Sequence, residues 1–247
     1  MRFDYLLWDF DGTLFDTYPA LVRAIEQALA EWGVSVPAAR IRALLATTLA
    51  DTIDALSAEF ELERAAFSAR VEHYRARTTP AERPPFPGVI ALCERFKAAG
   101  GANLLFTHRD RPTLDALLAW HQADHLFLDI LTTEDGYTRK PDPAGFCALI
   151  ERNAVPRDRA LAVGERELDV QAGEKGGGGG PGVVAARLPG WGPGSSTGRR
   201  ARRRASLPAC MTPHRRRASN RTSVSRRGTS WPRCWRCRRS NEDLTRR

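Results

Sequence analysis

Seven polar residues that could do chemistry stand at or shortly after apolar runs of this sequence. They supply four carboxylates, a hydroxyl, an imidazole and an amine: Asp9, Asp11, Thr107, His108, Lys140, Glu165 and Asp169. Carboxylates that gather at one place repel one another unless a cation neutralises them. Oxygen ligands favour Mg²⁺, which also binds substrate phosphate, and a lysine and a threonine suit the remaining phosphate oxygens. The set predicts a magnesium-dependent site that handles a phosphate group.

Asp9 and Asp11 are two positions apart, so their side chains would project to the same side of an extended backbone. One carboxylate could attack phosphorus and form an aspartyl-phosphate. The other could donate a proton to the leaving oxygen and later take one from water. Gly12 follows at once and permits a tight turn. The pair predicts a nucleophile next to a general acid and base.

The elements that must position these residues follow from the hydrophobic pattern. Short apolar runs predict buried strands at 3–8, 102–106, 126–131 and 160–163. Amphipathic patterns predict helices at 88–99, 111–121 and 142–152. Strands that alternate with helices form a parallel sheet, and ligands bind beyond the carboxyl ends of its strands. The candidate residues would therefore gather along one edge of that sheet.

A block of helices separates the first strand from the rest. Helical patterns fall at 18–32, 37–46, 49–58 and 61–77, with no clear strand among them. Four prolines between 80 and 87 then indicate a hinge or linker. We therefore expect a core of residues 1–16 and 81–175 with a helical insert at 17–80.

Four short motifs together resemble those of the haloacid dehalogenase superfamily. The first is Asp9-Phe-Asp-Gly-Thr-Leu14, and the second is Phe106-Thr-His108. The third is Arg139-Lys-Pro141, and the fourth is Gly164-Glu-Arg-Glu-Leu-Asp169. Their order and spacing resemble the family over residues 1–173. The insert is similar to the helical cap of the phosphoglycolate phosphatase-like subfamily.

This resemblance implies a fold and a role for each candidate residue. The fold would be α/β, a doubly wound parallel sheet with an inserted helical cap. By the resemblance, Asp9 is the nucleophile and Asp11 the general acid and base. Thr107 and Lys140 would hold the phosphate, with His108 beside them as a further candidate contact. The resemblance assigns Mg²⁺ to the Asp9 carboxylate, the Asp11 carbonyl and the fourth motif, here Glu165 and Asp169.

The resemblance also narrows the reaction. An aspartate two residues after the nucleophile is expected of phosphatases and phosphomutases, and the dehalogenase and phosphonatase branches lack it. We expect hydrolysis of a small phosphomonoester, a phosphorylated metabolite whose identity the sequence does not reveal. A phosphosugar mutase of the same fold is the alternative. The fourth motif usually opens with Gly-Asp, so the longer Glu165 predicts weaker metal binding or binding through a water.

Composition divides the chain into two unlike parts. Residues 1–175 hold 20 Lys and Arg against 27 Asp and Glu, whereas residues 176–247 hold 18 Arg, no Lys and two acidic residues. The acidic first part gives no sign of nucleic-acid binding. No run is apolar enough to span a membrane, and the N-terminus does not resemble a signal peptide. Residues 1–175 hold only two cysteines, Cys93 and Cys147, without a disulfide pattern, which favours the reducing cytoplasm. The oligomeric state stays open.

Residues 176–247 allow two interpretations. Four possible zinc ligands, Cys210, His214, Cys234 and Cys237, could form a basic nucleic-acid module. We favour a shift of reading frame near Gly176–Gly180, because the family pattern stops there and Arg, Gly, Pro and Ser take over. This second interpretation predicts a disordered tail with no role in catalysis, and a sheet whose last edge is left uncovered.

Overall fold

The computed structural model describes residues 2–176 and 184–187. Its strands are β1 Tyr5–Trp8, β2 Ala102–Phe106, β3 Phe127–Leu131, β4 Ala160–Gly164 and β5 Val184–Arg187. Its α-helices are α1 Tyr18–Ala30, α2 Ala38–Leu44, α3 Leu49–Glu59, α4 Arg64–Ala76, α5 Val89–Ala98, α6 Arg111–Trp120, α7 Ala144–Arg152 and α8 Glu167–Gly176. Short 3-10 turns lie at Pro80–Glu82, Asp124–Leu126, Thr133–Asp135 and Arg157–Arg159.

The described strands form one parallel sheet in the order β3-β2-β1-β4-β5. The chain leaves β1, returns as β2 and β3 on one side, and then crosses to β4 on the other. The strand order therefore reverses at β1, and the crevice at such a point is where doubly wound sheets bind ligands. The structure confirms the expected α/β fold with its inserted helices.

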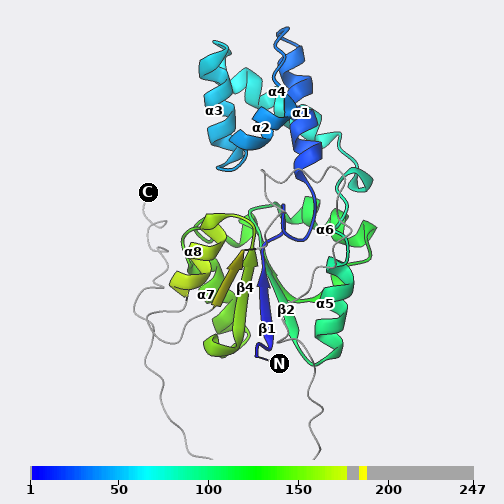
Figure 1. Cartoon of the computed structure of the whole chain (residues 1–247), viewed down its shortest axis with the longest axis vertical. Helices are drawn as coiled ribbons and strands as arrows, with labels where there is room; N and C mark the ends of the chain where they lie inside the picture. The colour runs from blue at the N-terminus through cyan, green and yellow to red at the C-terminus, as the bar shows by residue number, and fades with distance from the viewer. Residues whose placement is uncertain (1, 177–183, 188–247) are drawn as a thin grey trace, which may run out of the picture. The chain divides into compact units, whose positions relative to one another are not determined.

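Alternation along the strands gives the sheet two buried faces. Leu6 and Trp8 of β1 pack with α5 and α6, whereas Leu7 between them packs with α7 on the opposite face. This follows from the two-residue period of a strand. Figure 1 shows α5 on one side of the sheet and α7 and α8 on the other. Both faces are covered, as a parallel sheet requires.

The helices α1 to α4, which we call the cap helices, have a hydrophobic cluster of their own. Ile25, Ile41, Leu56 and Phe67 are wholly buried in it, one from each helix. Two chain segments join the cap helices to the sheet, and they pair with each other. The Asp16 N–H donates to the Pro84 carbonyl at 2.8 Å, and the Phe86 N–H donates to the Leu14 carbonyl at 2.9 Å.

The strand β5 is an element near the end of the chain that the sequence analysis did not place. It pairs with β4 in parallel, from Leu161 opposite Val184 to Gly164 opposite Arg187. The outer edge of β4 is therefore covered, and β5 is the last strand of the sheet among the described residues. The remaining expectations for the tail concern residues 177–183 and 188–247, including Cys210, His214, Cys234 and Cys237. They lie outside the described residues.

Candidate active site

The ends of three neighbouring strands bring the candidate residues together. Asp9 follows β1, Thr107 follows β2 and Glu165 follows β4. Backbone hydrogen bonds hold the residues just after β1 and β2 to the neighbouring strands. The Asp9 N–H donates to the Val163 carbonyl, and the Thr107 N–H donates to the Leu131 carbonyl. Asp9, Thr107 and Glu165 are each about 1% exposed. The structure thus places these three candidate residues at strand ends, where the sequence analysis expects a site.

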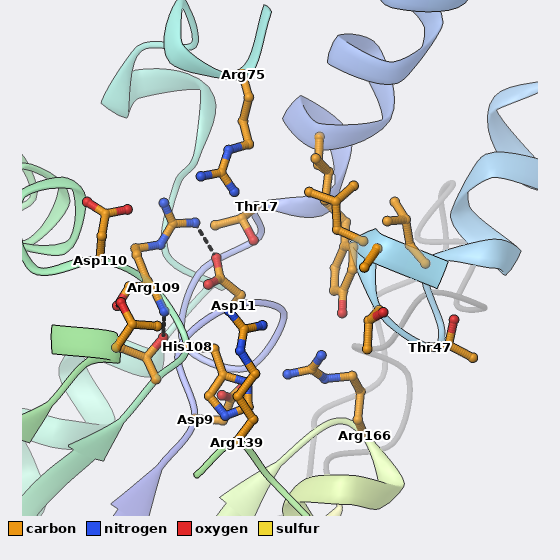
Figure 2. A pocket seen from close by; sticks show the side chains of 18 of the residues that line it. Asp9, Asp11, Thr17, Thr47, Arg75, His108, Arg109, Asp110, Arg139 and Arg166 are labelled. Carbon is orange, nitrogen blue, oxygen red and sulfur yellow. Dashed lines mark hydrogen bonds and ion pairs between the residues drawn. The ribbon is translucent and has the colours of Figure 1, made fainter. Parts of the chain in front are cut away.

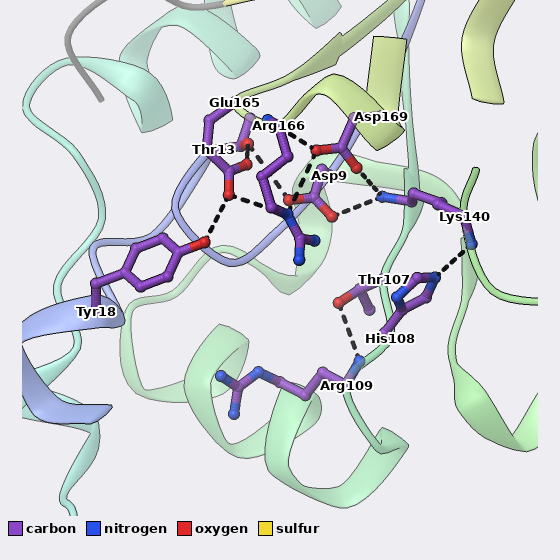
Figure 3. Close-up of polar contacts among 10 residues, drawn as sticks. All are labelled: Asp9, Thr13, Tyr18, Thr107, His108, Arg109, Lys140, Glu165, Arg166 and Asp169. Atoms are coloured by element: carbon purple, nitrogen blue, oxygen red, sulfur yellow. Dashed lines mark hydrogen bonds and ion pairs between the residues drawn. The ribbon is translucent and has the colours of Figure 1, made fainter. Parts of the chain in front are cut away.

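Lys140 joins two of the site's carboxylates, those of Asp9 and Asp169 (Figure 3). Its ammonium group donates to Asp9 Oδ1 at 2.6 Å and to Asp169 Oδ1 at 2.9 Å, and its side chain is completely buried. Burial lowers the pKa of Lys140, but the charges of Asp169 and Asp9 outweigh it, so the net pKa is raised and the amine stays charged. The aromatic rings of Phe106 and Phe146 flank the ammonium at 5.1 and 5.4 Å.

Three buried carboxylates form a candidate metal centre. One oxygen each from Asp9, Glu165 and Asp169 lies within 4.8 Å of the others. Burial, followed by the charge of Asp169, raises the pKa of Asp9. Burial, followed by the charges of Asp9 and Asp169, raises the pKa of Glu165 to about 8. These are the responses of carboxylates that lack a sufficient counter-charge.

The charges and the donor atoms of this centre both fit a divalent cation. Lys140 and Arg166 are the cations beside it, so three carboxylates face two positive groups. An added cation would supply the missing positive charge, and oxygen donors are the ligands that Mg²⁺ accepts. Asp9, Glu165 and Asp169 are the residues that would hold it.

Glu165 receives two hydrogen bonds from outside the strand that carries it. Thr13 Oγ1 donates to Glu165 Oε2 at 2.7 Å, and the Tyr18 hydroxyl donates to Oε1 at 2.8 Å. Burial and the charge of Glu165 raise the pKa of Tyr18, so the phenol keeps its proton and acts as a donor. The longer ligand found in the sequence therefore has partners fitted to it.

Asp11 has different surroundings from Asp9. Its carboxylate accepts a hydrogen bond from Arg109 Nη2 at 2.5 Å, and its side chain is 32% exposed (Figure 2). Burial raises the pKa of Asp11, but the charge and the hydrogen bond of Arg109 outweigh it, so the net pKa is lowered. Asp9 thus lies among the metal-centre carboxylates, whereas Asp11 lies on the solvent side, where it can exchange protons with water.

Thr107 and His108 line the same cavity as Asp9. The Thr107 Oγ1 accepts a hydrogen bond from the Arg109 N–H at 3.2 Å, which leaves its own proton for another acceptor. His108 Nε2 accepts a hydrogen bond from the Lys140 N–H at 3.0 Å. Burial, followed by the charge of Lys140, lowers the pKa of His108 to about 4. His108 is thus a neutral imidazole that positions the loop carrying Lys140.

A cavity of about 580 Å³ covers these residues and extends to the cap helices. Its lining is rich in positive charge, from Arg64, Arg75, Arg83, Arg109, Arg139, Lys140 and Arg166. Only three lining residues are acidic: Asp9, Asp11 and Asp110. An excess of cations in a partly closed cavity attracts anionic ligands.

Three of these arginines, Arg75, Arg83 and Arg109, make up what we call the arginine cluster. Figure 2 shows Arg75 pointing toward the Asp11–Arg109 ion pair. Burial, followed by the charge of Arg109, lowers the pKa of Arg83, and Arg75 lowers it further. The buried Arg109 Nε has no hydrogen-bond partner among the described residues. The arginine cluster can therefore bind an anion through its positive charge and its N–H donors.

Besides Arg75 and Arg83 of the arginine cluster, four residues of this site were not singled out from the sequence. Arg109 and Arg166 each stand just after a strand end or a motif residue, so the strand-end rule could have found them. Thr13 lies inside the first motif. Tyr18 gave no signal, because it falls on the apolar stripe of a helix that is expected to face a core.

Comparison with known proteins identifies the family. Residues 6–178 match the family model described as haloacid dehalogenase-like hydrolase. The chain belongs to this family. The phosphoglycolate phosphatase of Yersinia pestis is 30% identical over 179 residues, which make up 69% of this chain and 76% of that protein. The expected resemblance, and with it an enzyme of phosphatase type, is thereby confirmed.

Solved members of the haloacid dehalogenase-like fold agree with the described architecture. A predicted phosphoglycolate phosphatase from Haemophilus somnus gives a TM-score of 0.67 at 22% identity, covering 78% of this chain and 87% of that one. A protein described as a β-phosphoglucomutase from Thermotoga maritima gives 0.61 at 19% identity, covering 77% and 95%. At these identities the likeness shows the fold alone.

Proposed function

We propose that this haloacid dehalogenase-like hydrolase is a magnesium-dependent phosphatase that forms an aspartyl-phosphate on Asp9. The observation that carries the proposal is the buried group of Asp9, Glu165 and Asp169, in which Asp9 and Asp169 pair with Lys140. Mg²⁺ held by these carboxylates would neutralise charge and polarise the phosphoryl group. Thr107 and Lys140 would bind phosphoryl oxygens, and His108 would hold the Lys140 loop in place.

The reaction would take place in two displacements. In the first, an Asp9 carboxylate oxygen forms a bond to phosphorus while the bond to the ester oxygen breaks. Asp11 gives its proton to that leaving oxygen, and the alcohol departs. In the second, the Asp11 carboxylate takes a proton from water, whose oxygen attacks phosphorus. Inorganic phosphate leaves, and both Asp9 and Asp11 return to their starting states.

The arginine cluster supports a substrate with a second anionic group. Phosphoglycolate, the substrate in the name of the Yersinia pestis relative, carries a carboxylate one carbon from its phosphate ester oxygen. A carboxylate bound by Arg109 would compete with Asp11 for that guanidinium. Asp11 would then be released from the ion pair that holds its pKa low, and could carry the proton that the first displacement needs. We therefore propose phosphoglycolate, or a phosphorylated carboxylic acid like it, as the substrate.

The proposal extends to the cellular location of the protein. None of the described helices is both long and apolar enough to cross a lipid bilayer. Cys93 and Cys147 are both buried. We propose that the protein works in the cytoplasm on a small metabolite.

Release of inorganic phosphate by the purified full chain tests this function. With MgCl₂ we expect turnover of phosphoglycolate and none after chelation. Asp9→Asn should abolish turnover, because an amide does not attack phosphorus. Asp11→Asn should lower kcat on the order of 10²–10⁴-fold through loss of the general acid and base.

Two results would contradict the proposal. Near-normal turnover by Asp9→Asn would exclude Asp9 as nucleophile. Conversion of a hexose 1-phosphate to an isomeric sugar phosphate, without release of free phosphate, would show that the protein is a mutase and not a phosphatase.

A further inference from the structure

The Glu165 carboxylate is held by hydrogen bonds on both of its oxygens (Figure 3). Thr13 donates to one oxygen at 2.7 Å and Tyr18 to the other at 2.8 Å. The exposed fractions of Thr13, Tyr18 and Glu165 are 0%, 6% and 1%, so water does not compete for these bonds. Such bonds fix the direction in which a carboxylate presents its remaining lone pairs.

Tyr18 belongs to the cap helices and not to the sheet. It is the first residue of α1, and its ring packs in the cap cluster with Val22 and Ile25. The Arg42 guanidinium lies over the same ring at 5.7 Å. A hydrogen bond between Tyr18 and Glu165 therefore joins the cap helices directly to the candidate metal centre.

Gly12 leaves the space through which Tyr18 reaches Glu165. A Cβ atom at Gly12 would collide with Tyr18 Cε2 and would lie 2.8 Å from Glu165 Oε1. Its φ of +78° is one that other residues rarely adopt. The turn after Asp9 is thus built so that a phenol from α1 can meet the ligand after β4.

The length of Glu165 matters to this contact. Each carboxylate oxygen has two lone pairs, so an oxygen that accepts a hydrogen bond can also face a cation. An aspartate would be one methylene shorter and would withdraw from both Thr13 and Tyr18. Ligand length alone predicts that Glu165→Asp improves magnesium binding, whereas these two bonds predict the opposite.

We propose that Tyr18 is a positioning residue for Glu165. Because α1 carries Tyr18, the affinity for magnesium then depends on this helix of the cap. The proposal rests on the proposed function insofar as Glu165 is taken as a metal ligand. Tyr18 acts on the metal only through Glu165. Its removal should change metal affinity even when no substrate is present.

Calorimetric titration of the full chain with MgCl₂, without substrate, tests the role of Tyr18. Tyr18→Phe removes only the hydroxyl and keeps the ring packed, and it should weaken Mg²⁺ binding by about tenfold, as losses of ligand-orienting bonds commonly do. Tyr74→Phe is the matched control, because the Tyr74 hydroxyl also donates to a carboxylate, that of Glu31, within the cap helices. Tyr74→Phe should bind Mg²⁺ like the wild type.

A second background shows whether Tyr18 acts through Glu165. Glu165→Asp should bind Mg²⁺ more weakly than the wild type, and adding Tyr18→Phe to it should cause no further loss. A full tenfold loss from Tyr18→Phe in that background would overturn the proposal. Should Tyr18→Phe not fold, Glu165→Asp alone decides, since binding equal to or tighter than wild type contradicts a fitted Glu165.

The same titration separates this proposal from the proposed function. If the wild type takes up no Mg²⁺, the metal part of the proposed function fails. If the wild type binds Mg²⁺ and Asp169→Asn does not, but Tyr18→Phe binds like the wild type, then the metal centre stands and the role of Tyr18 is wrong.

Discussion

At the scale of single residues, two neighbouring aspartates differ because of the groups around them. Asp9 is buried with Asp169 beside it, and its pKa is raised. Asp11 is ion-paired with Arg109, and its pKa is lowered. The nearby cations Lys140 and Arg166 keep Asp9 closer to its charged, nucleophilic form than burial alone would allow. In the proposed mechanism, the same residue type would thus serve as nucleophile at position 9 and as proton carrier at position 11.

His108 predicts a pH dependence of stability. Its folded pKa of about 4 lies below its ordinary value of 6.5. Between pH 6.5 and pH 4, His108 is protonated in the unfolded chain but neutral in the folded chain. Its contribution to the free energy of unfolding is therefore fully present above pH 6.5 and is lost as the pH falls toward 4. His108→Gln keeps an acceptor for the Lys140 N–H but does not titrate, and its unfolding free energy should fall less over this window.

Urea unfolding at pH 7.5 and pH 5.5 measures the effect of His108. His73→Gln replaces an exposed histidine on α4 and serves as the control. Its pH dependence should match the wild type. Equal pH dependence in His108→Gln and the wild type would show that the imidazole is not held neutral in the fold.

At the scale of the elements, Arg70 and Arg75 of α4 differ in their position relative to the cavity. Arg75 lines the cavity and pairs with Glu72, whereas Arg70 pairs with Glu31 and does not line it. Arg75→Gln should raise KM for phosphoglycolate by roughly tenfold, the effect of losing one charged hydrogen bond. It should leave KM for ethyl phosphate, which lacks the carboxylate, nearly unchanged.

Steady-state kinetics on the two esters compare Arg75→Gln with Arg70→Gln. The Arg70 variant removes a similar surface ion pair from the same helix and should behave as the wild type with both esters. An equal rise in KM for both esters in Arg75→Gln would mean that Arg75 does not recognise the carboxylate.

The elements were more readily predicted from the sequence than the contacts between them. Amphipathic periodicity placed α6 at 111–121, and the structure has Arg111–Trp120. It extended α1 to Trp32, but the helix ends at Ala30, and Trp32 is 39% exposed and packs edge-on against Phe67. The positions of Asp9, Thr107 and Glu165 could be predicted from the ends of the expected strands, because parallel strands bring their carboxyl ends to one edge of the sheet.

The contact between Tyr18 and Glu165 lay beyond sequence reasoning for a physical reason. The two residues are 147 positions apart. The aromatic ring of Tyr18 fits the apolar stripe of α1, so periodicity accounts for the ring and gives no information about its hydroxyl. For the strand β5 the sequence offered only residues 183–185 as a candidate, since so short a run shows too little alternation to mark a strand.

At the scale of the whole molecule, β5 links the site to residues beyond the family match at 6–178. It pairs with β4, and β4 ends directly before Glu165. A chain cut to residues 1–176 loses β5 and exposes the backbone hydrogen-bonding groups of β4, an arrangement that favours association between sheet edges. A chain cut to residues 1–187 keeps this pairing.

Comparison of the two shortened chains tests whether β5 is needed for the stability of the fold and for Mg²⁺ binding. Residues 1–187 should unfold in urea at nearly the same concentration as the full chain and keep its Mg²⁺ affinity, because β4 still has a partner on each side. Residues 1–176 should unfold at a lower concentration and form aggregates that light scattering detects. The metal centre should weaken as well, since Glu165 then follows an edge strand. Equal stability of the two shortened chains would mean that β4 needs no partner beyond β1, and that the site is supported by residues up to Gly176 alone.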